Sequence, residues 1–264
     1  MEDMTGRIAL VTGACGGIGA AISRRFTEAG ATVVLCDIRA RELKALADEL
    51  SVAGTAVQQA VVDVTDEASV IELCSRTDES LGGLDVLVNT VGVVDDAGSV
   101  VTLPTSGWHR SLDLNLTSAF LMAKHAVPLL RKCRGAVIAN IASVSGMANQ
   151  ADAMVYSVTK AGLISLTRSE AIDLAPMGIR AVAICPGSVE TPLVEQAIIQ
   201  MAETTGQSAA QQRRQWELQY PSGRFSTAEE VADLTLFLCS DRARNITGSA
   251  TIIDGGLMAV LPER

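Results

Sequence analysis

Short apolar segments alternate with amphipathic segments along almost the whole chain. Seven segments are apolar at nearly every position, which is the pattern of strands that are buried on both faces of a parallel sheet. These predicted strands cover residues 7–11, 32–36, 56–62, 84–88, 136–141, 179–185 and 250–253. Between them, apolar residues recur at helical spacing. The predicted helices cover residues 18–28, 40–50, 67–81, 106–131, 154–174 and 227–239.

Seven strands that alternate with six helices predict an α/β fold, a doubly wound parallel sheet with helices on both faces. Thr227 and Glu230 form a predicted capping box at the start of the last helix. No linker rich in Ser, Gly or Pro and no internal repeat divides the 264 residues. We therefore expect a single domain over residues 1–264.

Residues 190–223 interrupt this alternation and are too numerous for an ordinary loop. Val194, Ala197, Ile198 and Met201 recur at helical spacing, and glutamines fill the polar positions between and after them. We expect a mobile lid over a binding site, with Met201 and its apolar neighbours toward the substrate and the glutamines toward water. The alternative is an insertion that packs against a neighbouring subunit.

Composition and charge exclude several classes of function. Hydrophobic residues make up 48% of the chain and aromatic residues only 3%, so the core must consist mainly of aliphatic side chains. The net charge of −9 disfavours binding to nucleic acids or to anionic membranes, and no run of ~18 apolar residues predicts a membrane span. Six cysteines without a C-x-x-C pair and only two histidines predict reduced thiols, a cytoplasmic location and no metal site.

A glycine-rich turn joins the first predicted strand to the first helix. Residues 12–19 read TGACGGIG. Gly13 allows a tight turn, Gly17 allows the backbone to approach a pyrophosphate, and Gly19 allows the helix to pack closely on the sheet. The anion would meet free backbone amides at the positive end of the helix. The turn therefore predicts a dinucleotide site.

Cys15 and Ile18 lie within this turn and are expected to contact the dinucleotide. We expect Cys15 to serve as a packing residue or in place of a hydroxyl. The alternative is a redox-sensitive thiol whose oxidation would block the entry of the cofactor, since thiols in such positions can be reactive.

The second strand ends at Asp37, which lies 18 residues after Gly19, close to the position of the acid that binds the adenosine ribose. A carboxylate there accepts hydrogen bonds from ribose hydroxyls and repels a 2′-phosphate, so NAD is favoured over NADP. Gly16 offers no basic side chain to such a phosphate. Arg39 could turn toward one, although we expect it to lie in solvent at the start of its helix.

Tyr156 and Lys160 are four residues apart and therefore share one face of a predicted helix. A nearby ammonium favours the phenolate, so we expect Lys160 to lower the pKa of Tyr156 from its usual ~10. Such a phenol can act as a general acid–base in hydride chemistry on an alcohol or carbonyl. Ser143 follows the fifth strand and can hydrogen-bond the reacting oxygen.

These motifs together resemble the short-chain dehydrogenase/reductase family over nearly the whole chain, from Arg7 to Gly256. The other matching pieces are Asp63-Val64, Asn115, Pro186-Gly187 with Thr191, and Asp254-Gly255-Gly256. The resemblance implies a Rossmann-type fold, a nicotinamide cofactor and the interconversion of a secondary alcohol and a ketone. It also implies a homotetramer, because the family usually assembles through its two long helices and its last helix and strand.

The resemblance assigns roles to individual residues. Tyr156 is the catalytic acid–base, Ser143 orients and polarises the substrate oxygen, and Lys160 tunes Tyr156 and holds the nicotinamide ribose. Asn115 completes a water-linked proton relay with Lys160. The implied cofactor-binding residues are Gly13, Cys15, Gly17, Ile18, Gly19, Asp37, Asp63, Val64, Asn89, Gly92, Tyr156, Lys160, Pro186, Gly187, Val189 and Thr191. The family's usual Asn-Asn-Ala-Gly is Asn89-Thr90-Val91-Gly92 here, a bulkier wall that we expect the cofactor site to tolerate.

The predicted substrate-contacting residues are Ser143, Val144, Met147, Gln150 and Tyr156. Their surroundings are apolar with a few amides and contain no obvious basic clamp, which favours a neutral cyclic or hydrophobic alcohol over a carboxylate or phosphate. The leading interpretation is an NAD-dependent alcohol dehydrogenase. The alternatives are an NADPH-dependent carbonyl reductase, such as a 3-oxoacyl thioester reductase, and a non-catalytic NAD-binding sensor.

Overall fold

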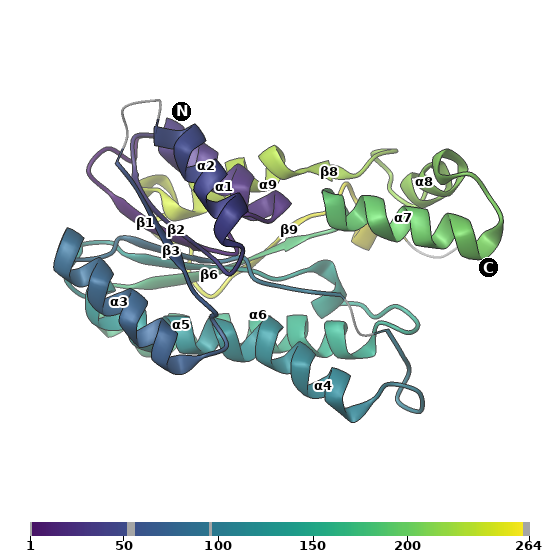
Figure 1. Cartoon of the computed structure of the whole chain (residues 1–264), viewed down its shortest axis with the longest axis horizontal. Helices are drawn as coiled ribbons and strands as arrows, with labels where there is room; N and C mark the ends of the chain where they lie inside the picture. The colour runs from purple at the N-terminus through teal and green to yellow at the C-terminus, as the bar shows by residue number, and fades with distance from the viewer. Residues whose placement is uncertain (1, 52–55, 95–96, 261–264) are drawn as a thin grey trace.

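The computed structural model of the chain describes residues 2–51, 56–94 and 97–260. A parallel sheet lies at its centre (Figure 1), with the strand order β3-β2-β1-β4-β5-β6-β9. The strands are β1 (Ile8–Thr12), β2 (Thr32–Asp37), β3 (Val57–Val61), β4 (Val86–Asn89), β5 (Val137–Ile141), β6 (Arg180–Pro186) and β9 (Ala250–Ile253). Each of the seven strands expected from the sequence is confirmed, with its bounds shifted by at most two residues.

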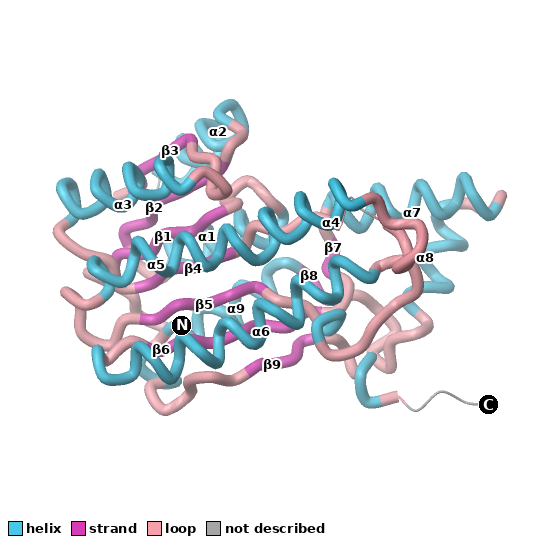
Figure 2. The backbone as a smooth tube through the Cα atoms, turned by 90° about the horizontal axis from the view of Figure 1, so that it is seen from below, coloured by secondary structure: helices cyan, strands magenta, loops and turns pink. Residues whose placement is uncertain are grey.

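Helices cover both faces of the sheet, so its strands are buried on both sides. One face carries α1 (Gly17–Glu28), α2 (Ala40–Ser51) and α9 (Ala228–Cys239). The opposite face, which Figure 2 shows from below, carries α3 (Glu67–Leu81), α4 (Thr105–Leu112), α5 (Ser118–Leu130) and α6 (Met154–Leu174). Along β1, Ala9 and Val11 join the core beneath α1, whereas Leu10 joins the core on the other face.

The capping box predicted for the last helix is present. The hydroxyl oxygen of Thr227 accepts a hydrogen bond from the amide of Glu230 at 3.2 Å, and the Glu230 carboxylate accepts one from the amide of Thr227 at 2.9 Å. Because these contacts satisfy amides that lack partners within the helix, they fix its start. Among the described residues, no helix is long and apolar enough to cross a membrane.

The predicted continuous helix over residues 106–131 is wrong in one respect. The structure divides it into α4, a π-helical turn η1 (Asp113–Thr117) and α5. A π-turn inserts an extra residue into the helical repeat and is frequent at functional sites. Here it holds Asn115, whose side chain hydrogen-bonds to backbone far away in the sequence.

Residues 190–223 contain two helices that extend beyond the end of the sheet (Figure 1). The segment comprises β7 (Val189–Glu190), α7 (Pro192–Thr205) and α8 (Ala209–Glu217), and β8 (Ser226–Thr227) follows it. Ile198 packs with Tyr220 and Phe225 in a small core of its own. Met201 is 43% exposed and lies outside that core, so the apolar face of α7 is centred on Ile198.

Candidate active site

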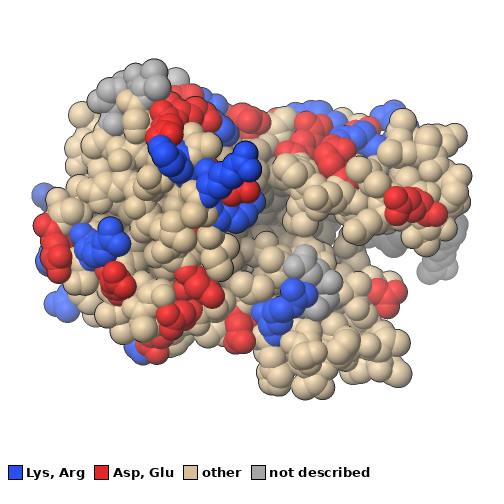
Figure 3. Space-filling view, in the orientation of Figure 1, with Lys and Arg blue, Asp and Glu red and all other residues tan. Residues whose placement is uncertain are grey.

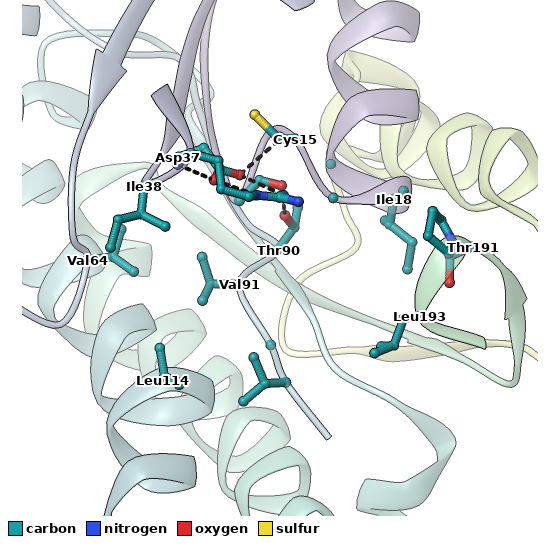
Figure 4. A pocket seen from close by; sticks show the side chains of 18 of the residues that line it. Cys15, Ile18, Asp37, Ile38, Val64, Thr90, Val91, Leu114, Thr191 and Leu193 are labelled. Atoms are coloured by element: carbon teal, nitrogen blue, oxygen red, sulfur yellow. Dashed lines mark hydrogen bonds and ion pairs between the residues drawn. The ribbon is translucent and has the colours of Figure 1, made fainter. Parts of the chain in front are cut away.

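A cleft of about 510 Å³ opens beside the glycine-rich turn, at the carboxyl ends of β1, β2 and β4 (Figure 4). Ligands of doubly wound sheets bind at such ends, where the strand order reverses. Ile18 and Thr191 lie toward one end of the cleft, and Asp37 and Ile38 lie toward the other. The predicted cofactor residues that line it are Gly13, Cys15, Gly17, Ile18, Gly19, Asp37, Asp63, Val64, Gly92 and Thr191.

The glycine-rich turn depends on its glycines for close contacts. Gly13 has a φ of +60°, a conformation that favours glycine. A Cβ on Gly19 would lie 2.2 Å from the carbonyl oxygen of Gly13, and a Cβ on Gly17 would lie 2.5 Å from a methyl group of Thr191. Gly16 is the N-cap of α1 and has no side chain, so the first amides of the helix are available to an anion. This arrangement fits a pyrophosphate.

Thr90 stabilises the same turn, a role that the sequence did not reveal. Its hydroxyl donates to the carbonyl oxygen of Thr12 at 2.5 Å, and its amide donates to the Thr12 hydroxyl at 3.2 Å. The Thr90 hydroxyl also lies 3.3 Å from the carbonyl oxygen of Gly13. Thr90 therefore ties the end of β4 to the glycine-rich turn.

Asp37 is 4% exposed and lines the end of the cleft that lies away from Ile18 and Thr191. Its carboxylate accepts hydrogen bonds from the amides of Cys15 at 2.9 Å and Arg39 at 3.0 Å. The Arg39 guanidinium adds an ion pair with this carboxylate at 3.1 Å. The sequence led us to expect Arg39 free in solvent, but in the structure it covers Asp37. Burial alone would raise the pKa of this carboxyl, but these hydrogen bonds outweigh it and lower the pKa.

Cys15 is a poor candidate for a redox-sensitive thiol. Burial, together with the neighbouring Asp37 carboxylate, raises the pKa of Cys15 to about 11. The thiolate is the reactive form of cysteine, and at neutral pH it is therefore strongly disfavoured at this position. The structure supports the interpretation of Cys15 as a packing residue whose amide binds Asp37.

Three predicted catalytic side chains meet where β5 leads into α6. The Lys160 ammonium, on α6, donates to the carbonyl oxygen of Ile141 at 2.8 Å and lies 5.7 Å from the centre of the Tyr156 ring. The Ser143 hydroxyl donates to the Pro186 carbonyl at 3.5 Å and lies near enough to Tyr156 to act on the pKa of its phenol. A Cβ on Gly92 would lie 3.0 Å from the Lys160 ammonium, so the lysine adjoins the cofactor cleft that Gly92 lines.

The pKa of Tyr156 is shifted in the opposite direction from the one expected. Tyr156 is only partly exposed. Burial raises the pKa of the phenol, and the Ser143 side chain opposes the rise without cancelling it. Burial also lowers the pKa of Lys160 to about 8, which weakens the cation on which the expectation depended. The prediction of a lowered Tyr156 pKa is therefore wrong for this arrangement.

Asn115 is buried, and its side chain clamps the backbone of Val93. Its amide oxygen accepts from the Val93 amide at 2.8 Å, and its amide nitrogen donates to the Val93 carbonyl at 2.9 Å. The same nitrogen donates to the Thr159 hydroxyl at 3.2 Å, next to Lys160 in the chain. The π-turn thus brings Asn115 to the catalytic group and fixes the cleft wall at Val93.

The remaining predicted site residues lie around the cleft without lining it. Asn89 is buried and donates to Asn140 at 2.9 Å, so it supports the sheet. Pro186 is the last residue of β6, Gly187 follows it, and Val189 begins β7. Thr191 then caps the start of α7. Val144 is buried beside Ser143, whereas Met147 and Gln150 are exposed on the segment between β5 and α6.

Several lining residues were not expected from the sequence. Gln196 of α7 lines the cleft, although its position in the pattern predicted a water-facing side chain, and Met201 lines a separate hollow on the same helix. The hydrophobic pattern did not indicate which side chains face the cleft, because the first turns of α7 line it with apolar residues and a glutamine. Ile38, Val62 and Leu114 also line the cleft without a signal in the sequence, whereas Thr90 and Val91 line it as the expected wall, and Pro192 and Leu193 belong to the expected lid.

Charge around the cleft is mixed. Figure 3 shows acidic and basic side chains interspersed over the visible face. The charged residues among the described lining residues are Asp37, Arg39 and Asp63. Because Asp37 and Arg39 pair with each other, the end of the cleft at Asp37 presents a partly neutralised carboxylate.

Comparison with known proteins gives matches over nearly the full chain. Residues 13–258 match the family model described as "Enoyl-(Acyl carrier protein) reductase". The cis-4-hydroxycyclohexanecarboxylate dehydrogenase of Sinomonas cyclohexanicum is 38% identical over 98% of this chain and 99% of that protein. A putative short-chain dehydrogenase/reductase from Burkholderia xenovorans superimposes with a TM-score of 0.91 at 35% identity, over 99% of this chain and 100% of that one.

A third similar protein was solved with ligands. L-sorbose reductase from Gluconobacter frateurii, in complex with NADPH and L-sorbose, superimposes with a TM-score of 0.94 at 29% identity, covering 99% of this chain and 100% of that one. Relatives of this kind are dehydrogenases and reductases that act on CH–OH groups. The sheet order, the glycine-rich turn and these matches together show that the chain is an oxidoreductase of the short-chain dehydrogenase/reductase family.

Proposed function

We propose that the protein is an NAD-dependent oxidoreductase that interconverts a secondary alcohol and a ketone on a neutral cyclic or hydrophobic small molecule. The observation that carries the choice of NAD is Asp37, a buried carboxylate at the adenosine end of the cleft. A ribose 2′-hydroxyl can donate to this carboxylate, whereas a 2′-phosphate is repelled by it.

The cleft has a suitable group for each part of a dinucleotide. The amides at the start of α1 would hold the pyrophosphate, and Asp37 would accept hydrogen bonds from the adenosine ribose. Val64 and Asp63 would flank the adenine. Lys160 and the segment from Pro186 to Thr191 would hold the nicotinamide half. The bound cofactor supplies the acceptor or donor of the hydride.

Tyr156 would transfer the proton that accompanies hydride transfer. In the oxidative direction, its phenolate accepts the proton of the substrate hydroxyl while Ser143 hydrogen-bonds the same oxygen. The Lys160 ammonium, which the Ile141 carbonyl holds, lies 5.7 Å from the centre of the Tyr156 ring and would oppose the burial that raises the pKa of the phenol. Asn115 would link Lys160 to water through a proton relay.

A second candidate function is NADPH-dependent carbonyl reduction. Arg39 favours it, because a guanidinium that leaves Asp37 could bind a 2′-phosphate. L-sorbose reductase, in complex with NADPH, is a similar protein. The name of the Sinomonas relative contains a cyclic secondary alcohol, which supports the cyclic part of the leading proposal, although that alcohol carries a carboxylate and is not neutral.

Residues 190–223 would act as a substrate lid, since Leu193 and Gln196 of α7 line the cleft. We also infer a homotetramer. Leu163 and Ala171 of α6 are buried within their own chain, whereas Phe120 of α5 and Ile172 of α6 are 48% and 74% exposed. These side chains give α5 and α6 an apolar surface for a second copy. The six free thiols suit a cytoplasmic location.

Cofactor reduction with a panel of secondary alcohols, in parallel with NAD and NADP, tests the proposal. We expect cyclic alcohols and NAD to give the highest kcat/KM. Tyr156→Phe should lower the rate by ~10²–10⁴-fold, because the general acid–base is lost. It should leave NADH binding largely intact. Equal kcat/KM for NAD and NADP, or near-full activity of Tyr156→Phe, would refute the corresponding part of the proposal.

A further inference from the structure

Tyr220 binds the residue that follows the Pro186-Gly187 dipeptide. It lies between α8 and β8 and is 4% exposed. Its hydroxyl donates to the Ser188 side-chain oxygen at 2.7 Å and accepts from the Ser188 backbone amide at 2.9 Å. One phenol thus holds both the backbone and the side chain of a single residue in the connection from β6 to β7.

The ring of Tyr220 fixes the same connection by packing. A Cβ on Gly187 would lie 3.0 Å from a ring carbon of Tyr220, so the absence of a side chain at Gly187 makes room for the ring. On its other side the ring meets Phe225, with 5.5 Å between ring centres, and Ile198 of α7 belongs to the same apolar cluster. Tyr220 therefore contacts the α7–α8 segment as well as the Gly187–Ser188 backbone.

We propose that Tyr220 is a positioning residue for the nicotinamide end of the cofactor site and acts through Ser188. This inference rests on the proposed assignment of Pro186 and Gly187 to the nicotinamide. Without the phenol hydroxyl, the Ser188 amide and side chain lose a shared partner, and the backbone that would contact the nicotinamide is released. Because Tyr220 also packs with Ile198, a movement of α7 would be transmitted to this backbone.

The test compares two ligands that share the adenosine, ribose and pyrophosphate groups but differ in the nicotinamide. Dissociation constants of NADH and ADP-ribose are measured for the natural protein and for Tyr220→Phe, which keeps the ring and removes the hydroxyl. We expect NADH to bind about tenfold more weakly to the variant, as for the loss of one to two hydrogen bonds. ADP-ribose should bind within about twofold of the natural protein, because its contacts lie elsewhere in the cleft.

Thr235→Val is the matched control. It removes another buried hydroxyl, which donates to the Val231 carbonyl within α9, far in sequence from the Ser188 connection. This variant should change neither dissociation constant. A general loss of stability would weaken both ligands in either variant, so the selective effect separates positioning from a purely structural role.

Ser188→Ala extends the test by removing one of the two partners of Tyr220. We expect Ser188→Ala to weaken NADH selectively, but less than Tyr220→Phe does. In the double variant, the loss of NADH affinity should be less than the sum of the two single losses. Equal weakening of both ligands by Tyr220→Phe, or no weakening of NADH, would overturn the inference. These measurements need no alcohol, so a protein that oxidises no alcohol would refute the proposed function and leave this result standing.

Discussion

A buried glutamate makes the stability of this protein depend on pH. Glu170 of α6 is 7% exposed. One of its carboxylate oxygens accepts from Asn140 at 2.8 Å, and the other has no hydrogen-bond partner among the described residues. Burial raises the pKa of Glu170 from 4.5 to about 7, and the hydrogen bond from Asn140 only partly opposes the rise. The folded protein therefore retains a proton that the unfolded chain loses.

The sign of the effect follows from proton linkage. Between pH 4.5 and about 7 the folded state binds more protons at Glu170 than the unfolded state, so the free energy of unfolding falls as the pH rises. The favourable contribution is fully present below pH 4.5 and is lost once the pH exceeds about 7. A difference of about 2.5 pKa units corresponds to about 3 kcal/mol in total. Integration over the two titrations places about 2 kcal/mol of this between about pH 5.5 and about 8.5.

Glu170→Gln keeps an oxygen that can accept from Asn140 and removes the titration. Urea unfolding of both proteins, followed by circular dichroism at one protein concentration, should show the variant gaining about 2 kcal/mol relative to the natural protein between about pH 5.5 and about 8.5. Glu72→Gln, an exposed position on α3, removes the same formal charge and serves as the control. Parallel stability profiles for the natural protein and Glu170→Gln would show that Glu170 is not the buried acid described here.

Three further predictions concern the cofactor, the lid and the assembly. Asp37→Ser should reduce the preference for NAD, measured as the ratio of kcat/KM values, by roughly ten- to hundredfold. Part of this change is a higher kcat/KM with NADP, and the double variant with Arg39→Ala should lose that increase, because Arg39 is then absent as a phosphate ligand. Hydrogen exchange in residues 190–223 should slow when NAD and a substrate analogue are added, whereas equal, strong protection in both states would favour a fixed subunit contact. Light scattering should report a tetramer at micromolar concentration, and charged substitutions at Phe120 or Ile172 should dissociate it, while a monomeric natural protein would refute the assembly.

Most of the sheet could be predicted because a strand covered on both faces needs apolar residues at nearly every position. The glycine-rich turn was equally predictable, since Gly13 and Gly19 meet steric requirements that recur wherever a strand passes into a helix at a phosphate site. Such features depend on residues that are close in the sequence, or on a constraint that acts at every position of an element.

Features that depend on distant contacts escaped prediction. The π-turn at Asn115 is associated with hydrogen bonds to Val93, 22 residues earlier, and no local pattern encodes that partner. Spacing placed Lys160 near Tyr156, but it could not reveal the burial that raises the pKa of the phenol. The bond from Tyr220 to Ser188 spans 32 residues and lies in a segment whose sequence indicated only helical periodicity.

At the ends of β4 and β5, residues that support the sheet are followed directly by residues that contact the glycine-rich turn and Lys160. Asn89 and Asn140 pair across the two strands, and Asn140 continues to Glu170 on α6. One residue further along, Thr90 binds the glycine-rich turn and the Ile141 carbonyl binds the Lys160 ammonium. Because the buried asparagines hold the register of the two strands, they also fix the separation between the cofactor turn and the catalytic lysine. The polar network beneath the cleft therefore fixes the geometry of the candidate site from within the sheet.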